Sequence, residues 1–312
     1  MSAGHAHDHD HDHDHGPQQL VAAARSEDPT QTKTVRQRYA QKLRGGYSRI
    51  NTLVREFVGK QDVLGLGELT AANPPPDFSF SRNDQKIEGF RRWLDQAQED
   101  EVLDVISRNG NRYVRQAYET GTRSANTDLR KAGLGEPESD IGITLQRPVH
   151  QDTLQTLYTR NFNELQGLTD EIGREVSREL TQALGEGTGP REAGRRITDV
   201  IGTVDDGTPR GAMARATTIA RTEILNARHM AAAEQYERFG VKKVEPILAP
   251  NACDLCIAVA ADAPYTVDKM RSVLPRHPNC RCSWTIYTGD GEVTASAHVH
   301  RKPARAVARQ VA

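Results

Sequence analysis

Apolar residues recur every three or four positions over much of the chain. Between residues 34 and 58 this spacing runs from Val35 to Phe57 and predicts an α-helix with one apolar face. The pair Gly45 and Gly46 interrupts the pattern, and we expect a kink there. The first part of the chain with a regular pattern is therefore an amphipathic helix.

The same spacing predicts further helices, separated by residues that disfavour helix. The sequence NPPPDFSFSRND predicts a loop over residues 73–84, NGN a break over 109–111, and glycine-rich segments a linker over 133–142 and a turn over 204–211. We expect helices over residues 85–108, 112–132, 151–184, 190–201 and 212–239. The segment 151–184 alone would extend for roughly 50 Å at about 1.5 Å per residue.

Two short segments near the C-terminal end follow the pattern of β-strands instead. Residues 241–248 are typical of a short strand, and residues 281–287 place Cys282, Trp284 and Ile286 on one face. Together they predict a small unit over residues 241–287. The expected fold class is therefore mainly α, with an elongated helical body and a small C-terminal α+β module.

Composition sets the expected boundaries. Only 36% of the residues are hydrophobic and 5% aromatic, which indicates thin cores and exposed helices. The alternating His-Asp tract near the N-terminus and the polar C-terminal residues cannot bury a core. We therefore expect a disordered His/Asp-rich N-terminus (1–32), a helical region (33–150), a second domain (151–290) that ends in the cysteine-bearing module (241–287), and a disordered basic tail (291–312).

Charge and hydropathy exclude some classes of partner. The formal net charge is −1, so no overall bias favours nucleic acid or a membrane surface. No apolar run approaches the ~20 residues that span a bilayer, and the N-terminus lacks the pattern of a secretory leader. We expect a soluble protein made in the cytoplasm, without a membrane partner, where reduced cysteines favour metal binding over disulfides.

The four cysteines of the chain lie close together in the sequence. CDLC contributes Cys253 and Cys256, and HPNCRC contributes His277, Cys280 and Cys282. Two pairs of ligands, each with two intervening residues, match the spacing of a tetrahedral structural zinc site. Sulfur and imidazole ligands favour Zn²⁺ over calcium or magnesium. Spacing favours His277 and Cys280 as the second pair of ligands, but Cys282 could replace either of them. The sequence therefore leaves open which two of these three residues bind the metal.

Other roles for the cysteines stay open at this point. They could form a pair of disulfides in a mature particle, or they could be unliganded thiols. A catalytic zinc ion would need an open coordination position and a nearby base. Asp254 and Asp262 are near in sequence but form no recognisable catalytic pattern. We expect a structural ion, no enzymatic activity and no small-molecule substrate.

The helix expected over residues 212–239 carries charged residues with two possible roles. Arg221 and Glu223 either lie on a solvated, ion-paired face or are buried partners that fix this helix against the cysteine-bearing module. His229 is expected at the surface rather than as a metal ligand.

Four motifs in order resemble a known family. GEGTGPREAGRRI (185–197), ARTEILNAR (220–228), CDLC (253–256) and HPNCRC (277–282) are similar to the phage head morphogenesis family, the phage Mu protein F-like minor head proteins of tailed viruses. The resemblance covers residues 151–287. The sequence CIAVAADAPY departs from the family pattern, because it lacks the glycine that the family often carries after the second cysteine.

The resemblance implies a non-enzymatic structural role in head assembly and DNA packaging. The expected partners are the portal protein or the major capsid protein, with packaged DNA as a further candidate. The expected location is the capsid interior or portal vertex of the virion, and the host cytoplasm during assembly. Two alternatives remain: a zinc-dependent nuclease, or a zinc-stapled DNA-binding protein that uses Arg191, Arg195, Arg196 and the C-terminal tail.

Overall fold

The computed structural model describes residues 28–67, 80–104, 106–202 and 211–289. The predictions for the His-Asp tract, for residues 73–79 and 204–210, and for the C-terminal tail concern residues outside this part of the chain.

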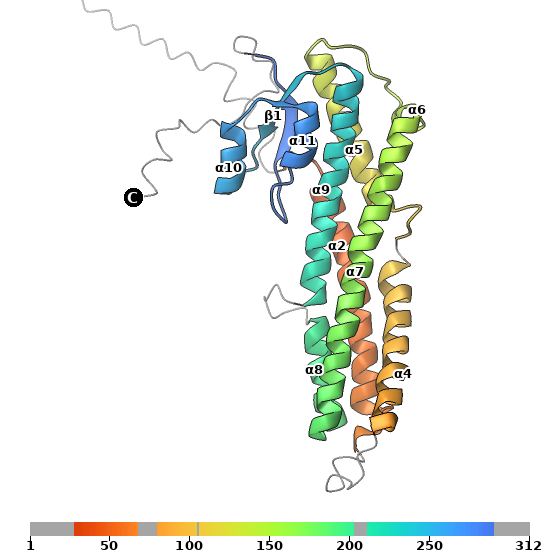
Figure 1. Ribbon diagram of the computed structural model, residues 1–312. Coiled ribbons are helices and arrows are strands. Elements are labelled where there is room, and N and C mark those ends of the chain that lie inside the picture. Colours follow the sequence, from red (N-terminus) through yellow and green to blue (C-terminus); the bar gives the residue numbers. More distant parts are fainter. Residues whose placement is uncertain (1–27, 68–79, 105, 203–210, 290–312) are drawn as a thin grey trace, which may run out of the picture.

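Long helices side by side form an elongated helical body, as Figure 1 shows. Its elements are α2 (Lys33–Val54) with the π-helical continuation η1 (Arg55–Lys60), α4 (Phe80–Gln98) with the π-helical continuation η2 (Glu99–Leu103), α5 (Arg112–Lys131), α6 (Ile141–Leu145), α7 (Pro148–Glu186), α8 (Pro190–Ile201) and α9 (Ala212–Arg238). All six helices that the apolar spacing predicts are therefore confirmed. α7, with 39 residues, exceeds its predicted length at both ends.

The structure corrects two local predictions. Residues 80–84 belong to α4 rather than to a loop, and α6 occupies the end of the expected linker. α2 is one continuous helix through Gly45 and Gly46. A Cβ atom at Gly46 would collide with the carbonyl oxygen of Glu101, so this glycine lets α2 approach the backbone of η2 closely.

The ends of two helices follow from individual residues. Asn111 caps α5, because its Oδ1 accepts hydrogen bonds from the backbone N–H groups of Tyr113 at 2.9 Å and Val114 at 3.3 Å. α7 begins at Pro148 and ends at Glu186, and its C-cap residue Gly187 has a φ of 64°, which glycine adopts at little cost. The NGN sequence is therefore both a break and a helix start.

α9 lies in the middle of the fold and contacts α2, α5 and α7. Of its 27 residues, 18 are buried, many of them alanines that allow close packing. Its first half belongs to the core of the helical body, where Tyr39, Leu94 and Leu165 are fully buried. Its second half packs against the C-terminal unit, so this one helix joins the two cores.

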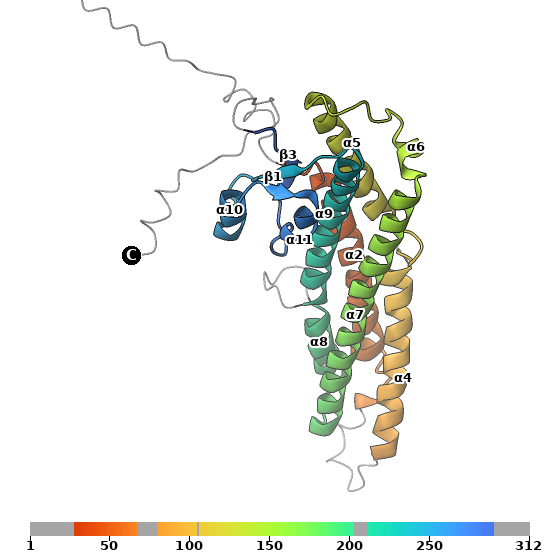
Figure 2. The same cartoon turned by 45° about the horizontal axis from the view of Figure 1, so that its top comes forward.

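The C-terminal unit, residues 241–287, is called the cysteine module below. Its sheet has the order β2-β1-β3, with both pairings antiparallel, and it stands beside one end of the body near α5 and α9 (Figure 2). The elements are β1 (Lys243–Ile247), α10 (Asp254–Ala261), β2 (Tyr265–Thr266), α11 (Val267–Val273) and β3 (Ser283–Ile286). The two predicted strands are confirmed, and the mainly α fold with a small C-terminal α+β module is as expected.

Candidate metal centre

The chain brings all five candidate ligands to one side of the cysteine module. Cys253 is the N-cap residue of α10, and Cys256 lies in the first turn of this helix. The other three belong to the segment between α11 and β3, residues 277–282, which we call the ligand loop. Antiparallel pairing of β1 with β3 places the start of α10 next to this loop.

The five side chains form two overlapping groups of three. One group contains Cys253, Cys256 and His277, and the other contains Cys256, Cys280 and Cys282. Within each group the ligand atoms lie within 4.8 Å of one another. Cys256 belongs to both groups, so it is the centre of the arrangement.

The measured separations suit a tetrahedral metal ion. The Sγ atom of Cys256 lies 3.7 Å from Sγ of Cys280 and 3.3 Å from Nε2 of His277. Bonds of ~2.3 Å to sulfur and ~2.0 Å to nitrogen at tetrahedral angles require ~3.8 Å between two sulfurs and ~3.5 Å between sulfur and nitrogen. The cluster could therefore hold a metal ion with little rearrangement.

Backbone groups orient two of the candidate ligands. Nδ1 of His277 lies 2.8 Å from the carbonyl oxygen of Pro278, to which a proton on Nδ1 can donate. That tautomer leaves Nε2, the atom that faces Cys256, with its lone pair available for a metal. The backbone N–H of Ala249 lies 3.5 Å from Sγ of Cys282 and donates to it, which helps to fix the position of this sulfur.

Hydrogen bonds between neighbouring thiols couple their ionisation. Cys256, Cys280 and Cys282 are buried, whereas Cys253 is exposed. Hydrogen bonds from the Cys256 and Cys282 thiols lower the pKa of Cys280, and the Cys280 sulfur in turn raises the pKa of Cys256. A thiolate at one cysteine therefore disfavours deprotonation of the neighbouring thiols. A bound cation would offset this repulsion and allow all three to ionise together.

The four cysteines are free in this structure. The 3.7 Å between Sγ of Cys256 and Sγ of Cys280 is far longer than the ~2.05 Å of a disulfide bond. The disulfide interpretation of the sequence therefore does not describe this fold.

His229 lies directly behind the ligand loop, and its predicted surface position is wrong. It is 2% exposed, with Nε2 at 3.1 Å from the carbonyl oxygen of Cys282 and Nδ1 at 3.3 Å from that of Leu274. Burial lowers its pKa to about 3, so the ring is neutral. It supports the loop from α9 and belongs to neither ligand group. Its sequence neighbours gave no sign of this, because α9 is buried on nearly every side here.

Arg221 and Glu223 do not pair with each other. Glu223 is buried and forms an ion pair with Arg160 of α7 at 3.2 Å. Arg221 is exposed and donates from Nη1 to Oδ1 of Asn279 in the ligand loop, over 3.3 Å. Neither interpretation of the sequence holds as stated, since one residue joins α9 to α7 and the other joins α9 to the ligand loop.

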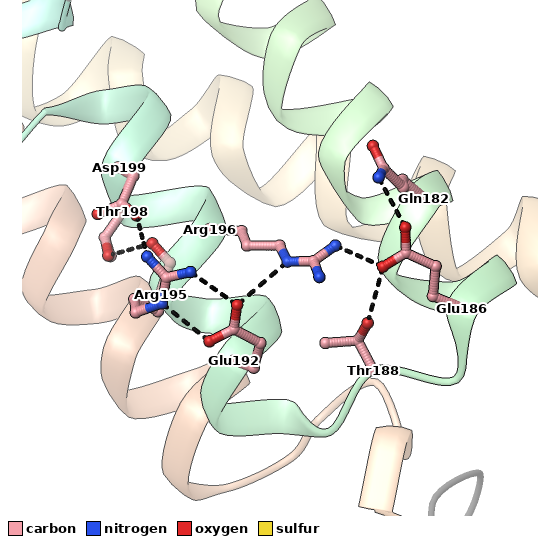
Figure 3. A network of polar contacts seen from close by, with 8 residues as sticks. All are labelled: Gln182, Glu186, Thr188, Glu192, Arg195, Arg196, Thr198 and Asp199. Carbon is pink, nitrogen blue, oxygen red and sulfur yellow. Dashed lines mark hydrogen bonds and ion pairs between the residues drawn. The ribbon is translucent and has the colours of Figure 1, made fainter.

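Two of the three arginines that the sequence offered for DNA contact, Arg195 and Arg196, lie at the α7–α8 junction among carboxylates (Figure 3). Arg195 forms ion pairs with Glu192 at 2.7 Å and Asp199 at 2.6 Å. Arg196 forms ion pairs with Glu186 at 2.7 Å and Glu192 at 3.2 Å. These contacts offset most of the positive charge at this junction.

Comparison of the chain with protein-family models, with curated proteins and with solved structures finds no significant match. The likeness to the head morphogenesis family therefore rests on the four motifs and stays a prediction. Among the described residues, no helix combines the length and the apolar content needed to cross a membrane.

Proposed function

We propose that the centre binds one Zn²⁺ ion and that the ion has a structural role. The observation that carries this is the tetrahedral spacing of sulfur and imidazole atoms around Cys256. Such donors favour zinc over the oxygen-preferring cations. A tetrahedral ion takes four of the five donors, and Cys256 is the ligand we expect first because it alone belongs to both groups. The ion would tie α10 to the ligand loop.

Metal analysis of the five single variants to serine or alanine tests this proposal. Wild-type protein purified without chelator should carry about one zinc per chain. Cys256→Ser should lose it, and three of the other four variants should weaken it strongly. The variant that keeps full zinc identifies the donor that is not needed. Far less than one zinc in the wild-type protein would refute the proposal.

In this proposal the centre is closed rather than catalytic, and the protein is not an enzyme. Five protein side chains compete for four positions, which leaves no position for water or substrate. Asp254 and Asp262 are exposed and belong to neither ligand group. Incubation of the zinc-loaded protein with DNA and Mg²⁺ distinguishes this role from a nuclease: intact DNA is expected, and cleavage lost on Cys256→Ser would contradict it.

We further propose that the protein is a minor head protein of a tailed virus, bound to the portal or the inner capsid surface. The support is that three of the four family-like motifs are neighbours in space. CDLC and HPNCRC share the metal centre, and Arg221 of ARTEILNAR contacts Asn279 of HPNCRC. The motifs thus belong to one structural unit, as expected if they are inherited together.

Co-purification tests this role. The full chain should bind the portal protein or major capsid protein encoded in the same genome, and purified particles should contain it in a few copies. Its absence from particles, together with normal head formation when its gene is deleted, would refute the role without affecting the zinc proposal.

A further inference from the structure

A polar cleft of about 550 Å³ lies where the start of α2, the middle of α9 and the ligand loop meet. Its charged residues and one asparagine come from three separate parts of the sequence. They are Asp28, Lys33, Arg36, Arg221, Asn279 and Arg281. The cleft is thus assembled by the tertiary fold and is distinct from the metal centre, although the ligand loop contributes to both.

Positive charge dominates this cleft. Four of its side chains are cationic and one, Asp28, is anionic, which leaves a formal charge of +3 (4 − 1). Asp28 is already engaged by Arg36 at 2.9 Å and by the backbone N–H of Lys33 at 2.6 Å. No carboxylate among the described residues forms an ion pair with Arg221 or Arg281.

The guanidinium groups at the rim contact only neutral oxygens in the described structure. Arg221 donates to Oδ1 of Asn279 at 3.3 Å, and Arg281 donates to the carbonyl oxygen of Pro250 at 3.1 Å. Each guanidinium has five N–H donors, so most of them remain available. The arginines at the α7–α8 junction are different, because carboxylates hold them in ion pairs.

Arg36 adds an independent sign that a partner is missing. Its residue is only 7% exposed, and its Nε atom is buried without a hydrogen-bond partner. A buried donor without a partner is uncommon and destabilising. Burial lowers the pKa of Arg36 and Asp28 opposes this shift, while the charges of Arg221 and Arg281 add a smaller lowering because like charges repel. An anion in the cleft would relieve this repulsion.

We propose that this cleft binds a phosphate group, with Arg221 and Arg281 as its direct contacts and Arg36 behind them. A phosphate is tetrahedral and can accept hydrogen bonds from donors that approach from several directions, as these arginines do. A carboxylate is planar, with two oxygens, and suits a single guanidinium fork better. The phosphate can be free inorganic phosphate or a phosphodiester of a nucleic-acid strand, since both present the same oxygens.

Calorimetric titration of the full, zinc-loaded chain tests this site. One titrant is inorganic phosphate, and the other is a single-stranded DNA oligonucleotide without terminal phosphates. The test variant is Arg221→Gln with Arg281→Gln, two exposed residues whose loss should leave the fold intact by circular dichroism. The control variant is Arg91→Gln with Arg178→Gln, two exposed arginines outside the cleft that remove the same charge.

The test variant should lose roughly tenfold or more in affinity for the phosphate titrant, and the control should stay within about twofold of wild type. Binding of free phosphate alone identifies a small-molecule site. Binding of the oligonucleotide, with a salt dependence that weakens in the test variant, identifies a nucleic-acid contact. Arg221→Lys with Arg281→Lys keeps the charge but loses the forked geometry, so it should bind with intermediate affinity.

Three results would overturn the proposal. The first is that neither titrant binds. The second is that the test and control variants lose affinity equally, which would show only a general charge effect. The third is that a short acidic peptide of glutamates binds more tightly than either phosphate titrant and loses affinity in the test variant, which would make the cleft a site for a protein partner.

Discussion

The helical body and the cysteine module fold around different kinds of core. The body buries apolar side chains along whole helices, such as Leu43 of α2 and Leu165 of α7, which are fully buried. The module has elements of only two to eight residues, and three of its buried side chains are candidate metal ligands. Apolar burial along repeated turns stabilises the body, whereas the module has too few such turns to rely on them.

The module also depends on the body for part of its core. Leu129 of α5 and Leu225 of α9 pack in the same cluster as Trp284 and Met270 of the module. The comparison therefore teaches that the module is supported by the end of the helical body on one side and, in our proposal, by a bound metal ion on the other. The four substitutions below test the module and the helical body separately.

The largest effect is expected from Cys256→Ser, which removes the ligand shared by both groups. Structural zinc contributes on the order of 10 kcal/mol in small zinc peptides. Hydrogen exchange should therefore show loss of protection in β1 and β3, while α4 and α7 keep theirs. Cys253→Ser, at the exposed ligand, should have a smaller effect. Simultaneous loss of protection in α7 would show that body and module are one cooperative unit.

A large effect on the body is expected from Leu165→Ala. This side chain is fully buried in the body core, so its truncation should lower the free energy of unfolding by about 2–5 kcal/mol. Urea denaturation measures it. Leu255→Ala in the module, where the side chain is 54% exposed, should stay within about 0.5 kcal/mol of wild type. Zinc content should be unchanged in both variants, and its loss in Leu165→Ala would contradict the separation of the two supports.

A moderate effect is expected at the contact between α5 and α9. A Cβ atom at Gly121 would collide with the carbonyl oxygen of Arg228, so Gly121→Ala should cost about 1–3 kcal/mol. Gly89→Ala on α4 is the matched control, because nothing lies near its added Cβ. That change should stabilise the helix by about 0.5–1 kcal/mol. Thermal melting of both variants measures the two effects. Equal changes in melting temperature would show that α5 and α9 can move apart enough to accept the added Cβ.

The smallest effect concerns the pH dependence of the body. His150 is fully buried, with Nδ1 at 2.8 Å from the Tyr118 hydroxyl, and burial lowers its pKa below the usual 6.5. Above pH 6.5 both folded and unfolded states hold the neutral ring. As pH falls below that value, only the unfolded state gains the proton, so stability is lost by up to about 1.4 kcal/mol per pH unit.

His150→Gln should remove this part of the pH dependence. Urea denaturation between pH 7.5 and 5 gives the difference between variant and wild type, which cancels the other histidines. A pH profile that is the same in both proteins would show that His150 takes up its proton without unfolding.

Local spacing determined much of what could be predicted. The helices of the body follow from apolar residues every three or four positions, because that period is a property of the helix itself. The five candidate ligands also follow from spacing, since two residues separate Cys253 from Cys256 and the ligand loop carries the other three within six positions. Neither prediction needs a distant contact.

Tertiary structure decided the rest. α10, α11 and β2 are too short to show a period, and each depends on its neighbours: α11 packs on α9 and β1, α10 packs on β1, and β2 pairs with β1. The same cover buries His229 behind the ligand loop. The ion pair of Glu223 with Arg160, and the cleft that gathers Arg36, Arg221 and Arg281, join residues far apart in the chain. Local spacing in the sequence does not predict such contacts, because the packing of whole helices determines which charged residues face one another.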